Sequence, residues 1–189
     1  MLALLLLAQV AKGLIVFVGS SIFHRWTSLE RQMAPLPIYN VAFDGAETTD
    51  WLQLVDMRVV APHPKVVVYY CGSNDVDAGR PVPDIYRGIQ LFATRVLSAL
   101  PDSRFVFVSV IRAPEKRDRW DAVDRINQQM REFARTTPRV QFVDVNPVFF
   151  NADGSSRMEL FMNDQLHLRP PAYEEFTKIL KPVLTEALR

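Results

Sequence analysis

Three segments of this 189-residue chain carry side chains that could act together on an acyl group. The first contains Ser20 and Ser21, the second contains Asn74, and the third contains Asp164 and His167. A serine hydroxyl can attack a carbonyl carbon, an imidazole can remove its proton, and a carboxylate can hold that imidazole in place. An asparagine amide can stabilise the negative charge that develops on the carbonyl oxygen.

The spacing of Asp164 and His167 favours a catalytic pair. An aspartate three residues before a histidine can fold back in a loop, so that its carboxylate meets Nδ1 of the imidazole. This contact fixes the tautomer and leaves Nε2 free to take a hydroxyl proton. The other two histidines, His24 and His63, have no acidic residue close to them in the sequence. His167 is therefore the preferred candidate for the base.

Each segment also has a simpler interpretation. A serine that follows a strand and Gly19 can cap a helix without doing chemistry, and the same helix start could hold a phosphate or a flavin. Asn74 and Asp75 could form a turn with local hydrogen bonds. The candidates gain weight only if the fold brings them together.

Short apolar runs along the chain predict buried strands. They cover residues 14–18, 37–41, 65–71, 104–111 and 140–145. Continuous apolar runs of this length are typical of strands that are covered on both faces, as in a parallel sheet.

Segments with helical periodicity separate these runs. Apolar residues recur every three or four positions at residues 85–100, 120–133 and 173–183. Each segment therefore presents one apolar face. Two shorter helices are expected at residues 21–31 and 48–56, and Pro182 is expected to kink or end the last helix.

The alternation of strands and helices continues along the whole chain, with no internal repeat and no linker. It predicts an α/β fold with a single domain, a flavodoxin-like three-layer α/β/α sandwich around a five-stranded parallel sheet. Ligands of such sheets bind beyond the carboxyl ends of the strands. The serines and Asn74 follow two of the predicted strands directly, so we expect them at this edge.

Taken together, the motifs resemble the SGNH hydrolase superfamily, also called GDSL-type esterases, over nearly the whole chain from Gly13 to about Leu184. The matching segments are residues 19–21, 40–45, 72–75 and 164–167. Three positions depart from the usual pattern. Ser20 replaces an aspartate, Ala46 stands where serine or aspartate is more frequent, and Ala172 stands where glycine is common.

The resemblance implies a carboxylic ester hydrolase that works through an acyl-enzyme. Ser21 would be the nucleophile, His167 the base, and Asp164 the residue that orients the base. The N–H groups of Ser21 and Gly45 and the amide of Asn74 would form the oxyanion hole. No metal and no organic cofactor are implied. Short connections leave little room for a lid, which favours esters with small or accessible acyl groups.

Two alternative functions stay open at this point. A flavodoxin-like module could bind a phosphate or a flavin at residues 19–21, although this leaves Asp164 and His167 unexplained. A member of the family could also have lost catalysis and serve as a binding protein.

Composition excludes several other classes of protein. The net charge of +1 gives no support for a nucleic-acid partner. A single cysteine, Cys71, rules out an intramolecular disulfide framework and a cysteine-rich zinc site. The expected partner is a small-molecule ester, without stable insertion into a membrane.

Residues 1–11 form an apolar segment, expected as a short helix or a signal-like sequence, ahead of a hydrolase domain at residues 12–189. The apolar run is too short to span a bilayer, which takes about 20 residues. We expect a cytoplasmic protein. Cleavage near Ala11 would instead indicate a secreted or periplasmic one.

Overall fold

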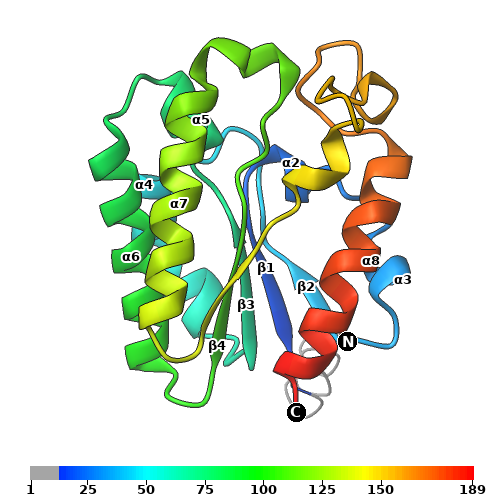
Figure 1. Ribbon diagram of the computed structural model, residues 1–189. Coiled ribbons are helices and arrows are strands. Elements are labelled where there is room, and N and C mark those ends of the chain that lie inside the picture. The colour runs from blue at the N-terminus through cyan, green and yellow to red at the C-terminus, as the bar shows by residue number, and fades with distance from the viewer. Residues whose placement is uncertain (1–12) are drawn as a thin grey trace.

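A five-stranded parallel sheet forms the centre of the computed structural model, which describes residues 13–189 (Figure 1). The predicted apolar segment at residues 1–11 lies outside this range. The strands are β1 (Ile15–Gly19), β2 (Ile38–Asn40), β3 (Val66–Tyr70), β4 (Arg104–Val108) and β5 (Val140–Val143). Their order is β2-β1-β3-β4-β5, and all neighbours are parallel. The predicted sheet is confirmed.

Helices cover both faces of the sheet and complete the three layers (Figure 1). One face carries α4 (Thr48–Leu54), α6 (Val82–Ala99) and α7 (Trp120–Thr136), with the short α5 (Ser73–Asp77) above them. The other face carries α3 (Leu29–Met33) and α8 (Pro170–Ala187), and α2 (Ser21–His24) follows β1 directly. Short segments of other helical types are η1 (Val55–Val60), η2 (Pro114–Arg119), η3 (Asn146–Phe149) and η4 (Met158–Leu160).

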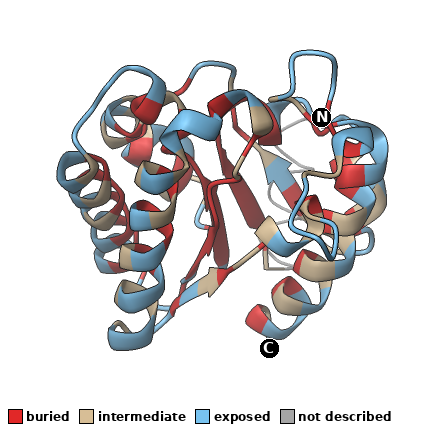
Figure 2. Cartoon of the chain, turned by 45° about the horizontal axis from the view of Figure 1, so that its top comes forward, coloured by how far each residue is buried: buried red, intermediate tan, exposed pale blue. Residues whose placement is uncertain are grey.

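The core lies in two layers, one on each side of the sheet. Successive side chains of a strand point to opposite faces, so Ile15 and Phe17 of β1 enter one layer and Val16 and Val18 enter the other. All residues of β1 and β3 are buried, and Figure 2 shows the buried strands between the more exposed helices. Burial on both faces explains why the strands are continuous apolar runs in the sequence.

The helix predicted at residues 21–31 is wrong, because the chain forms two short helices there. α2 ends at His24 and α3 begins at Leu29. Trp26 lies in the connection and is only 2% exposed. Its ring stacks on Tyr173 of α8 at a centroid distance of 5.1 Å. Leaving the helix allows this large side chain to reach the core.

The other helices differ from the prediction only at their ends. α8 does not end at Pro182 but continues to Ala187. Pro182 and Lys178, the residue one turn earlier, are both exposed, so water can reach the carbonyl that a proline cannot bond. The short helix α4 ends at Leu54, and η1 extends its path to Val60.

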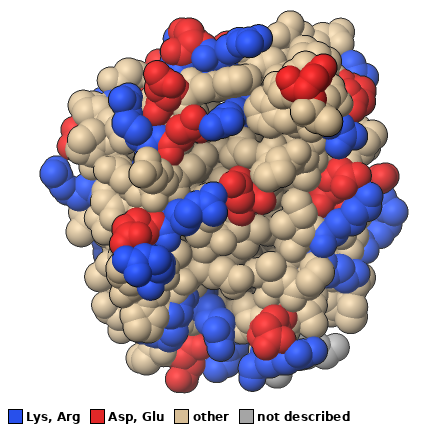
Figure 3. Space-filling model, viewed as in Figure 1, with Lys and Arg blue, Asp and Glu red and all other residues tan. Residues whose placement is uncertain are grey.

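Two further observations concern the surface. Within residues 13–189, no helix combines the length and the apolar character needed to cross a membrane. Basic and acidic side chains are interspersed over the face seen in Figure 3, in keeping with the near-neutral net charge.

The sheet order places the predicted site at a specific point. β2 and β3 flank β1 on opposite sides, so the chain changes direction across the sheet there. Crevices at such switch points, beyond the carboxyl ends of the strands, are the usual ligand sites of open α/β sheets. α2 and α5, which carry Ser21 and Asn74, both begin at this end (Figure 1).

Candidate active site

The segment that leads to Ser21 runs tightly against the neighbouring strand. A Cβ atom on Gly19 would lie 2.3 Å from the carbonyl oxygen of Tyr70, so only glycine fits at this position. The N–H of Ser20 donates to the same oxygen at 3.2 Å. The side chain of Ser20 precedes α2 but makes no capping hydrogen bond. Ser21 is the first residue of α2.

Ser21, His167 and Asp164 form a chain of hydrogen bonds. Nε2 of His167 lies 3.0 Å from Oγ of Ser21, and Nδ1 of His167 lies 2.6 Å from Oδ2 of Asp164. An ionised carboxylate only accepts hydrogen bonds, so Nδ1 carries the proton and Nε2 can accept the proton of the serine hydroxyl. The structure therefore brings together the three residues that the sequence analysis selected.

The Asp164 carboxylate is held by its own loop. Oδ1 accepts the N–H groups of Leu166 at 3.0 Å and of His167 at 2.9 Å. Gln165, between them, has a φ of 57°. Desolvation opposes ionisation of Asp164, but the bonds from His167 and Leu166 outweigh it and lower its pKa to about 2. The carboxylate is therefore ionised at neutral pH.

Asn74, in the first turn of α5, and Gly45, in the loop between β2 and α4, lie at the same end of the sheet. Gly72 leaves β3 with a φ of 125°, which starts the turn into α5. Nδ2 of Asn74 then donates to the carbonyl oxygen of Ala46 at 2.9 Å. Gly45 is exposed and has a φ of 77°. Across residues 13–189, the N–H groups of Ser21 and Gly45 donate to no protein acceptor.

Comparison with known proteins decides the family. The sequence matches the GDSL-like Lipase/Acylhydrolase family over residues 17–175. The chain belongs to this family. Accordingly, this GDSL-like acylhydrolase is a carboxylic ester hydrolase, as the sequence motifs predict. The family match favours this activity over binding of a phosphate or a flavin.

Individual relatives of the acylhydrolase are distant. Human platelet-activating factor acetylhydrolase IB subunit alpha1 is 25% identical over 181 residues, which cover 92% of this chain and 76% of that protein. The structure of a GDSL-like lipase from Bacteroides thetaiotaomicron has a TM-score of 0.80 at 18% identity, covering 94% of this chain and 90% of that one. A Clostridium thermocellum family 3 carbohydrate esterase has a TM-score of 0.74 at 19% identity, with 93% and 96% covered. The two structures share the fold.

In this GDSL-like acylhydrolase, side chains hold the loop of residues 40–46 against α2. Nδ2 of Asn40 donates to the carbonyl oxygen of Phe23 at 2.8 Å, and its Oδ1 accepts the N–H of Ala42 at 3.1 Å. Nδ1 of His24 donates to the carbonyl oxygen of Ala42 at 2.9 Å. Sequence reasoning gave His24 no role, because its partner is a backbone carbonyl that no motif marks.

Asp75 joins α5 to the start of α4. It is 1% exposed, and its carboxylate accepts the N–H of Thr48 at 3.0 Å and the Thr48 hydroxyl at 2.5 Å. Burial raises the pKa of Asp75, although the bonds from Thr48 oppose this shift. Asp75 therefore makes a long-range contact instead of the local turn considered from the sequence, and it supports the loop between Gly45 and α4.

Lys116 is a second support that the sequence analysis missed. This lysine is 1% exposed. Its Nζ donates to the carbonyl oxygen and the hydroxyl of Ser73 at 3.1 and 3.0 Å, and to the carboxylate of Asp77. The neighbouring N–H of Glu115 donates to the carbonyl oxygen of Gln165 at 3.2 Å. η2 thus connects the helix that carries Asn74 with the Asp164–His167 loop.

His63 lies away from this group. It precedes β3 and has a φ of 52°. A residue ahead of a strand lies at the amino end of the sheet, whereas Ser21 and Asn74 follow the carboxyl ends. His63 therefore does not contribute to the candidate site, in agreement with its low priority in the sequence.

Proposed function

We propose that the protein hydrolyses carboxylic esters with small or accessible acyl groups through an acyl-enzyme on Ser21. One observation carries this proposal, namely the continuous hydrogen-bond chain from Ser21 Oγ through His167 to Asp164. It combines a nucleophile, a base whose Nε2 faces the hydroxyl of that nucleophile, and an ionised carboxylate that fixes the tautomer of the base.

In the first half of the reaction, Oγ of Ser21 attacks the acyl carbon while Nε2 of His167 takes the hydroxyl proton. The C–O bond to the alcohol then breaks, and His167 gives that proton to the leaving oxygen. In the second half, His167 removes a proton from water as the water oxygen attacks the acyl carbon. The bond between the acyl carbon and Oγ of Ser21 then breaks, His167 returns the proton to Oγ, and the carboxylic acid leaves. Asp164 stabilises the imidazolium in both halves.

The oxyanion of each tetrahedral intermediate would be bound by the N–H groups of Ser21 and Gly45 and by the amide of Asn74. Two facts support this assignment. The N–H groups of Ser21 and Gly45 have no protein acceptor within residues 13–189, and Asn74 uses one amide hydrogen on Ala46, which leaves the other for a ligand. Such donors stabilise charge that develops only during the reaction.

The preference for a small acyl group rests on two lines of support. The connections that follow β1, β2 and β3, which lead to Ser21, Gly45 and Asn74, are short and leave little room there for a segment that could bind an extended acyl chain. The curated human relative is by name an acetylhydrolase. An acetyl ester is therefore the first substrate to test.

The proposal is tested with p-nitrophenyl esters of increasing acyl length, together with a fluorophosphonate probe. We expect turnover to be highest with acetate and to fall as the acyl chain lengthens, and we expect the probe to modify Ser21 alone, as seen by peptide mass mapping. A protein that neither turns over any ester nor reacts with the probe would be a silent member of the family, and the proposal would be wrong.

A further inference from the structure

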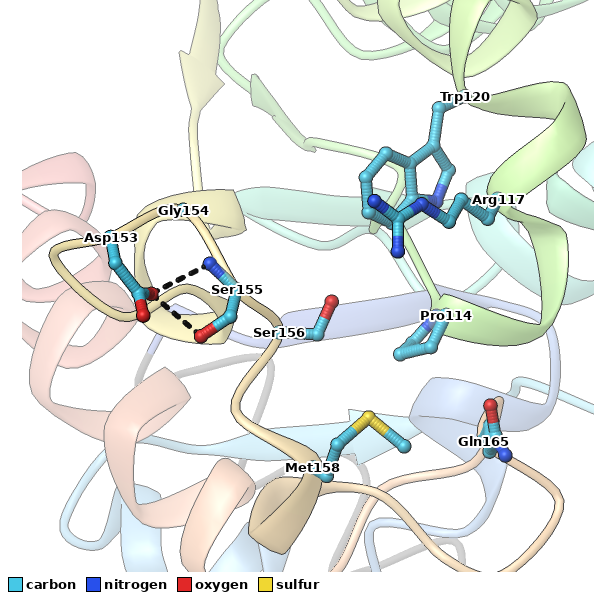
Figure 4. A pocket seen from close by; sticks show the side chains of 9 residues that line it. All are labelled: Pro114, Arg117, Trp120, Asp153, Gly154, Ser155, Ser156, Met158 and Gln165. Carbon is cyan, nitrogen blue, oxygen red and sulfur yellow. Dashed lines mark hydrogen bonds between the residues drawn. The ribbon is translucent and has the colours of Figure 1, made fainter.

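A cavity of about 600 Å³ lies beside the Asp164–His167 loop. Figure 4 shows it between the segment that carries Arg117 and Trp120 and the loop that carries Ser156 and Met158, with Gln165 at its edge. Its volume lies in the range of small-molecule sites. None of the residues proposed to perform catalysis lines it.

Arg117 supplies a cation at one side of the cavity. Its guanidinium lies 5.5 Å from the centre of the Trp120 ring, and Figure 4 shows it directed into the cavity. Two other arginines of this region are neutralised, since Arg112 pairs with Asp124 and Arg119 pairs with Asp77. Within residues 13–189, Arg117 forms no such ion pair, so its N–H groups are available to a ligand.

Trp120 is fixed in a way that favours this use of Arg117. Its Nε1 donates to the carbonyl oxygen of Ala113 at 2.8 Å, and its ring meets Phe150 edge-on at 5.6 Å. A guanidinium that rests on an aromatic face gains cation–π attraction while keeping its hydrogen-bond donors. Trp120 therefore positions the guanidinium of Arg117 and leaves the N–H groups of that guanidinium free to bind a ligand.

Among residues 13–189, Asp153 is the only other charged residue that lines the cavity. Its carboxylate accepts the N–H of Ser155 at 2.9 Å and the Ser155 hydroxyl at 2.6 Å. Figure 4 shows this pair on the opposite side of the cavity from Arg117. A ligand near Arg117 therefore meets the cation, while the carboxylate of Asp153 lies across the cavity and is already engaged by Ser155.

Ester cleavage constrains where the alcohol part and the acyl part of a substrate lie relative to His167. His167 must protonate the leaving oxygen, so the alcohol part lies on the imidazole side of Ser21. Gln165 stands two residues before His167 and lines the cavity. A leaving alcohol that passes along the Asp164–His167 loop would therefore extend past Gln165 toward Arg117.

We propose that this cavity is a subsite for the leaving alcohol and that Arg117 binds an anionic group, a carboxylate or a phosphate, carried by that alcohol. Guanidinium matches both anions with paired hydrogen bonds. This inference rests on the proposed ester hydrolysis and adds a preference for the alcohol.

The test uses three acetyl esters with the same acyl group, namely phenyl acetate, 4-acetoxybenzoate and 4-acetoxyphenyl phosphate. For each ester, kcat/KM is measured for the wild type, Arg117→Gln and Arg125→Gln. Arg125 is exposed on α7 and does not line the cavity, so its variant controls for the loss of one positive charge. Comparing each variant with the wild type on the same ester removes the different reactivities of the three leaving groups.

We expect Arg117→Gln to lose about 10–100-fold in kcat/KM on at least one anionic ester, the usual effect of a hydrogen bond to a charged group. Most of this loss should appear in KM, and phenyl acetate should be unaffected. The ester with the larger effect identifies the preferred anion. An equal loss on all three esters, an equal loss in Arg125→Gln, or no change on either anion would overturn the proposal. Turnover of phenyl acetate tests ester hydrolysis alone, because this ester carries no anion. A failure of the Arg117 proposal can therefore be distinguished from a failure of the proposed ester hydrolysis.

Discussion

Nδ2 of Asn74 donates a hydrogen bond of 2.9 Å to the carbonyl oxygen of Ala46. This bond couples the orientation of the amide to the loop that carries Gly45, so two proposed oxyanion donors are positioned together. The acceptor is a backbone group, which any residue supplies. The alanine at position 46 is therefore compatible with the arrangement.

The first prediction concerns the Asn74 amide. Asn74→Ala should lower kcat on p-nitrophenyl acetate by roughly 10²–10³, the effect of one oxyanion donor, with little change in KM. Asn74→Asp keeps the shape but places a negative charge near the developing oxyanion, so its loss should be larger. A folded Asn74→Ala protein within a few-fold of wild-type kcat would remove Asn74 from the mechanism.

The second prediction separates the two adjacent serines. Ser21→Ala should lower kcat by a factor on the order of 10⁵–10⁶, because the nucleophile is lost. Ser20→Ala is the matched control, since the Ser20 side chain makes no capping hydrogen bond and its removal should leave kcat almost unchanged. Steady-state turnover and fluorophosphonate labelling of both variants give the comparison. The reverse pattern would assign the nucleophile to Ser20.

The third prediction follows from the pKa of Asp164, which is lowered to about 2 from its ordinary 3.8. A carboxyl with a lowered pKa in the folded state adds stability that is complete above the unfolded value and is lost as the pH falls toward the folded value. The free energy of unfolding should therefore fall more steeply between pH 4 and about pH 2 in the wild type than in Asp164→Asn.

Urea denaturation at several pH values measures this difference. The Asp164 side chain is 47% exposed, so solvent screening keeps the difference small. Other titrating groups, including Asp75 with its raised pKa, act equally in both proteins and cancel. Parallel pH dependences for the two proteins would show that Asp164 is not preferentially ionised in the folded state.

The fourth prediction concerns the buried amine of Lys116. Lys116→Met should reduce the free energy of unfolding by about 1–3 kcal/mol, because the carbonyl oxygen of Ser73 loses a buried donor. Arg119→Gln removes an exposed partner of the same Asp77 and should change stability by less than about 0.5 kcal/mol. Urea denaturation of both variants decides the matter. Equal effects would mean that the contact with Ser73 contributes little.

The strands were predictable because burial on both faces leaves continuous apolar runs. The observed strands lie within or at the edges of those runs, as in β3 and β4. The break between α2 and α3 was not predictable in the same way. Helical periodicity continues through Trp26. Its departure from the helix is favoured by packing against distant residues, above all Tyr173 and Phe176 of α8.

The candidate site was predictable where its contacts are local or its motifs are shared. The three-residue spacing of Asp164 and His167 is enough to predict their contact. Ser21 and His167 are 146 positions apart, so predicting their contact required the fold and the family resemblance. Lys116 gave no signal, because a lysine among charged neighbours at residues 115–119 is usually solvated. Only the tertiary structure shows that its amine is enclosed.

His167 and Asp164, the proposed base and its carboxylate, belong to a single tight turn, in which the N–H of Met162 donates to the carbonyl oxygen of His167 at 2.7 Å. Any shift of that turn as a rigid unit would carry Asp164 and His167 together and preserve their mutual geometry. The gap to Ser21 alone would open. The separation between Nε2 of His167 and Oγ of Ser21 would then control whether the proposed site can react, while Asp164 would keep the imidazole in the same orientation.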